Sequence, residues 1–262
     1  MPIINDQPVV TPVAETPPVP MVSGGLAPLT GRFDNASGLG ATISGQVVLK
    51  GTPPPEIQNN AISADPNCSR FHSQPVKTQF YVVSTNGGLA NVFVFIRSGL
   101  EGKQFTPPTT PVLINQVGCE YEPYISAAMV RQTIRVGNSD PVLHNVHPTP
   151  TARGNRESNR AQMPGASPLN FSFNVAELPI RIKCDVHPWM FAYVFVVDHP
   201  FFAITDENGN FSIKNVPTGK YVLEAYHLKT HRDKSAGVTQ SITVNDNQTI
   251  EANFVVDLTN RR

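Results

Sequence analysis

Three side chains that bind soft metal ions stand close together within residues 184–190, which read CDVHPWM. Cys184 offers a thiolate, His187 an imidazole and Met190 a thioether. Sulfur donors combined with imidazole favour copper over magnesium or calcium, and two histidines and one cysteine with a long axial methionine form a set used for electron transfer. The run therefore needs one further histidine to complete a copper site.

The best candidate for that histidine is His144, which lies upstream in the sequence His144-Asn145-Val146-His147. This stretch follows a strand-like run, so a β-strand would carry the imidazole towards the cysteine-containing loop. The alternative is that Cys184 is a small buried hydrophobe, Met190 packs in the core and both histidines find local partners.

The two motifs together resemble those of the cupredoxins, the small blue copper proteins, and the short interval from cysteine to methionine is similar to that of the amicyanins. The resemblance covers roughly residues 120–198. It implies a Greek-key β-sandwich with one type 1 copper, for which His144, Cys184, His187 and Met190 are the ligands. The combination of these two motifs is specific by the standards of short sequence patterns.

The same resemblance assigns roles to neighbouring residues. It implies that Asn145 ties the two ligand-bearing loops together without touching the metal, and it leaves His147 outside the ligand set. It also implies that His187, with Pro188 and Trp189, forms a small exposed apolar patch through which a partner exchanges electrons.

The expected function is that of a type 1 copper protein that carries single electrons in an extracytoplasmic redox chain. We expect no enzymatic activity, because an electron carrier binds and transforms no substrate. No phosphate-binding loop or nucleophile elbow is evident, so the sequence gives no independent support for hydrolase or kinase chemistry. The alternative is a structural accessory subunit of an extracytoplasmic or membrane-associated complex, with copper non-essential or absent. Copper delivery is a weaker alternative, since a closed four-ligand site favours holding the metal.

Two further cysteines, Cys68 and Cys119, remain once Cys184 is assigned to copper. They could form a disulfide, which would be consistent with an oxidising compartment. They could also be two free buried thiols, or could join His72 in a second metal site whose spacing matches no common closed site.

Composition bears on partners and location. The formal net charge is +0 and the pI is about 7.1, so nucleic acid is not an expected partner. No apolar run is long enough to cross a bilayer, and the first twenty residues lack the basic and apolar regions of a signal peptide. Cupredoxins usually work outside the cytoplasm, so we expect a periplasmic or extracytoplasmic protein whose partner is a redox protein or a larger membrane-associated complex.

The fold class expected from 25 prolines and short alternating apolar runs is all-β. Around the copper module, two groups of strand-like runs resemble the carboxypeptidase regulatory-like domain, a small transthyretin-like β-sandwich: residues 43–53 on one side and residues 202–225 on the other. An insertion between two strands requires only that the termini of the inserted domain lie close together.

We therefore predict four segments along the chain. Residues 1–40 form an extended proline-rich arm. Residues 41–104 and 199–258 are the two parts of one carboxypeptidase regulatory-like sandwich, and residues 105–198 are the cupredoxin-like copper domain. Within the last, the long polar stretch 148–170 is either a functional loop or a solvated insertion.

Overall fold

The computed structural model describes residues 40–230 and 237–259. Almost all regular structure in these ranges is β-strand, and the helical elements are α1 (Asn60–Ala64) and the 3-10 turn η1 (Ser69–Phe71). The predicted all-β class is therefore confirmed. No helix in the described ranges has the length and apolarity to span a membrane. The predicted arm, apart from Gly40, lies outside the described residues.

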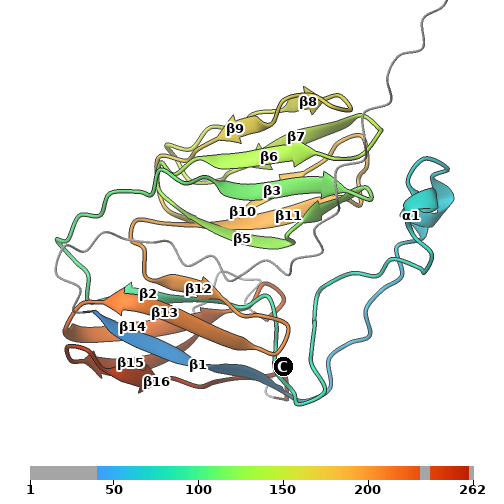
Figure 1. Cartoon of the computed structure of the whole chain (residues 1–262). Coiled ribbons are helices and arrows are strands. Elements are labelled where there is room, and N and C mark those ends of the chain that lie inside the picture. Colours follow the sequence, from blue (N-terminus) through green and yellow to red (C-terminus); the bar gives the residue numbers. More distant parts are fainter. Residues whose placement is uncertain (1–39, 231–236, 260–262) are drawn as a thin grey trace, which may run out of the picture.

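The strands between residues 112 and 197 form two facing sheets, here named the ligand-bearing sandwich (Figure 1). One sheet has the order β4 (Glu120–Glu122), β3 (Val112–Val117), β6 (Ile134–Asn138), β9 (Leu169–Phe171). The other has the order β5 (Ile125–Met129), β11 (Phe191–Val197), β10 (Glu177–Lys183), β7 (His144–Thr149), β8 (Arg160–Gln162). Alternate residues of β3 and β6 are buried, as expected of strands with one face on a core.

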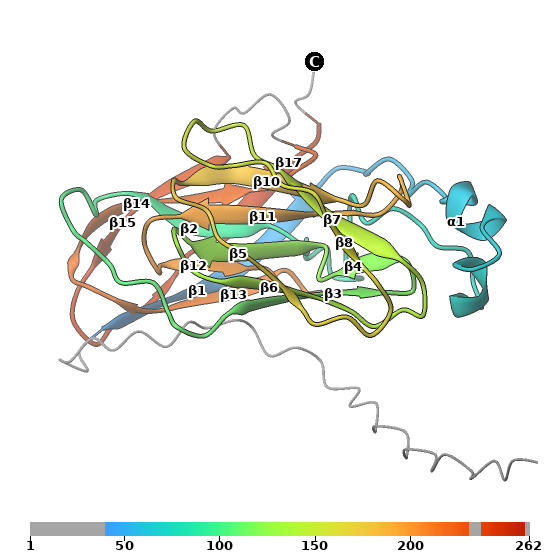
Figure 2. The same ribbon diagram turned by 90° about the horizontal axis from the view of Figure 1, so that it is seen from above.

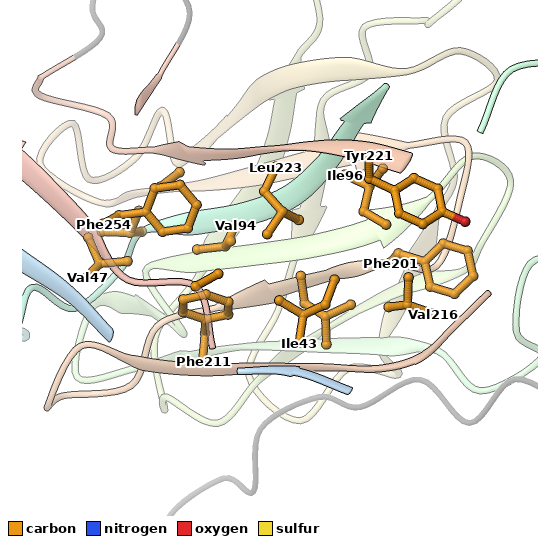
Figure 3. Packing of buried hydrophobic residues seen from close by; sticks show 14 of the residues in the cluster. Ile43, Val47, Val94, Ile96, Phe201, Phe211, Val216, Tyr221, Leu223 and Phe254 are labelled. Carbon is orange, nitrogen blue, oxygen red and sulfur yellow. The ribbon is translucent and has the colours of Figure 1, made fainter. Parts of the chain in front are cut away.

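The remaining strands form a second pair of sheets, here named the flanking sandwich. One sheet pairs β1 (Ala41–Lys50) with β13 (Asn210–Val216), β16 (Thr249–Glu251) and β17 (Phe254–Asp257). The other has the order β12 (Phe202–Ile204), β2 (Phe93–Ser98), β14 (Gly219–Tyr226), β15 (Val238–Val244). Figure 3 shows side chains from both sheets, among them Ile43, Phe211 and Leu223, filling the space between them.

A separate apolar cluster joins the two sandwiches. Phe93 of β2 stacks on Phe195 of β11 with ring centroids 4.5 Å apart, and both side chains are fully buried. Ile125 and Val197 from one sandwich and Tyr226 from the other complete this contact. The cluster lies where the chain passes from β11 of one sandwich to β12 of the other. Side-chain packing, as well as chain connectivity, therefore holds the two sandwiches together at this point.

Residues 57–78, here named the cap, carry α1 and η1 and lie beyond one end of the ligand-bearing sandwich (Figures 1 and 2). The two ends of the cap pair through an isolated bridge between Gln58 and Lys77. A disulfide joins Cys68 of the cap to Cys119, in the turn between β3 and β4. The cap thus falls within the segment predicted for the flanking sandwich, yet its disulfide attaches it to the ligand-bearing sandwich.

Candidate metal centre

Three of the four predicted ligands converge in the interior. The Nδ1 atoms of His144 and His187 are 3.0 Å apart, and Cys184 Sγ lies 4.0 Å from the first and 3.8 Å from the second. All three residues are buried. Bonds from a metal to imidazole nitrogen and thiolate sulfur are about 2.0–2.3 Å long, so donors with these separations can share one ion.

The strand arrangement explains why residues distant in sequence meet here. His144 begins β7, and Cys184 directly follows the end of β10, which pairs antiparallel with β7 at Lys183 and His147. The loop 184–190 then closes on itself, because the Cys184 N–H donates to the Met190 carbonyl at 3.0 Å. Adjacent antiparallel strands therefore deliver both ligand-bearing segments to the same end of one sheet.

Asn145 holds these two segments together, as predicted. Its Oδ1 atom accepts hydrogen bonds from the N–H groups of Asp185 at 2.7 Å and Val186 at 3.2 Å, and its own N–H lies 3.5 Å from Cys184 Sγ. These contacts position the sulfur without requiring Asn145 to meet an ion.

The stretch 148–170 also supports the ligand strand. It contains β8, which pairs with β7 so that Gln162 lies opposite His144, and β9 follows it on the facing sheet. The side chain of Gln162 is buried and hydrogen bonds to Gln116 at 2.7 Å. Part of this stretch is therefore integral to the sandwich rather than a solvated loop.

Met190 and His147, the other two side chains considered for the site, lie in different surroundings. Met190 is fully buried in the same apolar cluster as Cys184, and its role as fourth ligand stays a prediction. His147 points to another set of partners, with Nδ1 2.6 Å from Asp185 Oδ2 and Nε2 2.6 Å from Glu157 Oε1. That placement agrees with its exclusion from the ligand set.

Asp140, which was not predicted from the sequence, contacts His144 directly. Asp140 Oδ2 accepts a hydrogen bond from His144 Nε2 at 2.8 Å, and the carboxylate is almost completely buried. A carboxylate accepts and does not donate, so this contact places a proton on Nε2 of His144. In the neutral ring, Nδ1 then keeps a free lone pair directed towards Cys184 and His187. Nothing in the local sequence distinguishes Asp140 from an ordinary turn residue before a proline.

Burial and these contacts act in opposite directions on the ionisable groups. Burial raises the pKa of the Cys184 thiol, but hydrogen bonds with His144 and the surrounding backbone outweigh it, and the net pKa is lowered. Burial lowers the pKa of His144, but Asp140 and Cys184 outweigh it, and the net pKa is raised. For His187, burial and the neighbouring His144 both lower the pKa. These shifts favour a thiolate at Cys184 and a neutral imidazole at His187, two of the deprotonated donors that a metal ion needs.

The prediction that His187 forms an exposed patch is wrong, since only 6% of its surface is accessible. Both disulfide sulfurs, of Cys68 and Cys119, lie within 4.8 Å of a His187 ring nitrogen. Trp189 is half-buried, and its indole N–H donates to the Cys119 carbonyl at 3.2 Å. Sequence patterns around residues 184–190 could not show this, because the covering cap comes from a distant part of the chain.

Comparison with known proteins gives limited matches. A family profile described as polysaccharide lyase family 4, domain II, matches residues 197–252. This description differs from the carboxypeptidase regulatory-like resemblance, which stays a prediction. Among curated proteins, none matches the chain.

Several solved copper proteins resemble part of the structure. A purple cupredoxin from Nitrosopumilus maritimus is 21% identical and covers 32% of this chain and 98% of its own, with a TM-score of 0.27. An oxidised variant of amicyanin is 19% identical and covers 39% of this chain and 97% of its own, with a TM-score of 0.30. Similarity at these scores does not assign the chain to a family.

A third similar structure is the copper-containing nitrite reductase of Thermus scotoductus SA-01. It is 18% identical with a TM-score of 0.31, over 37% of this chain and 24% of the reductase, so the chain spans about a quarter of that protein. The reductase is an enzyme. Our prediction that the chain is not an enzyme is therefore wrong as an inference from the ligand motifs, because similarity to copper proteins does not separate carriers from enzymes.

Proposed function

We propose that the chain is a cupredoxin-type protein that binds one type 1 copper and transfers single electrons. His144, Cys184 and His187 would be the equatorial ligands and Met190 the axial ligand. The observation that carries the proposal is the convergence of one sulfur and two Nδ1 atoms, all buried, at separations of 3.0–4.0 Å. Two imidazoles and one thiolate are the trigonal donors of such sites.

When bound, copper supplies one-electron chemistry between its Cu(I) and Cu(II) states. The chain prepares the donors for it. The lowered pKa of Cys184 favours its thiolate form, and Asp140 holds His144 in one tautomer. Asn145 holds both ligand segments together, and the cap covers His187, of which 6% remains accessible. A site braced in this way changes little in geometry between two oxidation states, which keeps reorganisation small.

We also propose that the protein works outside the cytoplasm, attached to a redox partner protein or a membrane-associated complex. The disulfide between Cys68 and Cys119 supports an oxidising compartment. Exposed apolar side chains flank both histidine ligands, with Leu143 before His144 and Val186 before His187. These positions supply surface for transient docking although His187 itself is covered.

The domain division is proposed on similar grounds. A single buried cluster unites β1 and β2 with the strands after residue 200, from Ala41 and Ile96 to Phe254. This supports residues 41–104 and 199–258 as two parts of one domain that flanks residues 105–198, with the cap as an extension from the first part.

The decisive experiment is a Cu(II) titration of the purified chain followed by absorption spectroscopy. We expect an intense blue thiolate-to-copper band that ascorbate bleaches reversibly. Cys184→Ser should abolish the band while circular dichroism keeps its β-sheet signal, because the sandwich core is built from apolar packing.

A matched control uses the neighbouring histidine that lies outside the site. His147→Ala should keep the band, whereas His144→Ala should lose it. A wild-type protein that stays colourless with copper, or a Cys184→Ser variant with the wild-type spectrum, would contradict the proposal and favour a structural role for the chain.

A further inference from the structure

We infer that Asp140 is a positioning residue that holds His144 as an Nδ1 ligand and lowers the reduction potential of the copper site. The inference rests on the proposed function for its effect on the potential. Its structural part, the tautomer of His144, stands on the hydrogen bonds of the chain itself and can be tested without copper.

The Asp140 carboxylate accepts three hydrogen bonds in the interior. Oδ2 accepts from His144 Nε2 at 2.8 Å and from the Cys119 N–H at 2.8 Å, and Oδ1 accepts from the Gly118 N–H at 2.6 Å. Only 4% of the residue is accessible. A buried anion with three donors is well satisfied, whereas a buried anion without them would be strongly unfavourable.

The geometry of the β3–β4 turn explains why two amides face this carboxylate. Gly118 and Cys119 form the two-residue loop of the hairpin, with φ values of 63° and 58°. Two successive positive φ values are typical of a type I′ turn, and Gly118 adopts such a value without steric cost. The turn therefore presents adjacent N–H groups to Asp140, while the Cys119 side chain bonds to the cap.

This arrangement makes the two histidine ligands unequal. His144 donates to an anion, whereas His187 packs against the disulfide and the Trp189 ring, with ring centroids 5.1 Å apart. A carboxylate that accepts the proton of an imidazole raises the basicity of the other ring nitrogen. A more basic Nδ1 favours the more highly charged Cu(II), so Asp140 lowers the potential.

Asparagine cannot reproduce these contacts. Its side chain has one acceptor oxygen and one NH₂ donor, so in either orientation at least one of the three donors around Asp140 faces another donor. Asp140→Asn is therefore the informative change, because it keeps the size of the side chain and removes both the charge and the full set of acceptors.

The first test is the reduction potential of copper-loaded protein measured by voltammetry. We expect Asp140→Asn to raise the potential by about 59 mV, which is a tenfold change in the equilibrium constant for a one-electron couple. Asp140→Glu, which restores a carboxylate, should recover part of the wild-type value. The matched control is Glu157→Gln, which removes a carboxylate 2.6 Å from Nε2 of His147, a histidine outside the ligand set.

An unchanged potential in Asp140→Asn overturns the inference. An equal shift in Glu157→Gln also overturns it, because the effect would then come from net charge rather than from contact with His144. If wild-type protein binds no copper, the proposed function fails, and the second test alone decides the structural part.

The second test reads the tautomer of His144 by ¹⁵N NMR in metal-free wild-type protein, at a pH high enough to leave its ring neutral. It needs no variant that folds poorly. We expect His144 to carry its proton on Nε2. A predominantly Nδ1-protonated His144 overturns the inference whatever the copper measurements show.

Discussion

Met190 is the proposed axial ligand of the copper site. Its side chain is fully buried beside Cys184, in a cluster otherwise made of hydrocarbon and aromatic groups. Met190→Gln should keep copper but lower its reduction potential, because an amide oxygen favours Cu(II) more than a thioether does. We expect a shift of at least about 59 mV, or tenfold in the one-electron equilibrium constant, measured by voltammetry of the copper-loaded variant.

The control for this change is Met163→Gln, since Met163 is 60% exposed and lies outside the ligand loop. It should leave the voltammogram unaltered. Equal potentials for wild type and Met190→Gln would remove Met190 from the ligand set and leave a three-coordinate site.

The cap is the element that distinguishes this site from an open one. Cys68 and Cys119 are 51 residues apart. A disulfide that closes a loop of that size lowers the entropy of the unfolded chain, and this stabilises the folded state by about 4 kcal/mol. The double variant Cys68→Ala with Cys119→Ala should lose stability of about that size in urea unfolding. It should also let azide perturb the copper spectrum, because His187 would no longer be covered.

Ser63→Ala, at an exposed position of α1, is the matched control in the same segment and should alter neither property. A double variant that unfolds at the wild-type urea concentration and still excludes azide would show that non-covalent contacts, among them the packing of Ile62, hold the cap closed.

At the scale of the whole molecule, the two sandwiches are coupled through Phe195. This fully buried ring stacks on Phe93 and meets Tyr226 edge-on at 5.7 Å between centroids. Phe195→Ala should cost about 3–5 kcal/mol and separate the unfolding of the two sandwiches. Trp189, the single tryptophan, reports the ligand-bearing sandwich by fluorescence, whereas circular dichroism reports both.

In the wild type the two signals should change together, as in a cooperative transition. Phe173→Ala, inside the ligand-bearing core, should lower the common midpoint without separating the signals. Coincident curves for Phe195→Ala would show that this contact does not couple the sandwiches.

The sequence by itself was sufficient where the relevant contacts are local or periodic. The spacing of Cys184, His187 and Met190 places three donors in one short loop, and the alternation of apolar residues in runs such as 41–49 predicts strands with one buried face. The pair His144 and Asn145 was recognisable because the predicted ligand and the residue that ties the two loops together are adjacent in the chain.

Only the tertiary structure decided what surrounds those donors. Asp140 meets His144 where the chain crosses from β6 in one sheet to β7 in the facing sheet, and the cap covers His187 because Cys68 reaches a turn 51 residues away. The exposed His187 predicted from sequence was wrong for this reason. Burial depends on which distant segments pack against a residue, and the local spacing of residues does not reveal which segments those are.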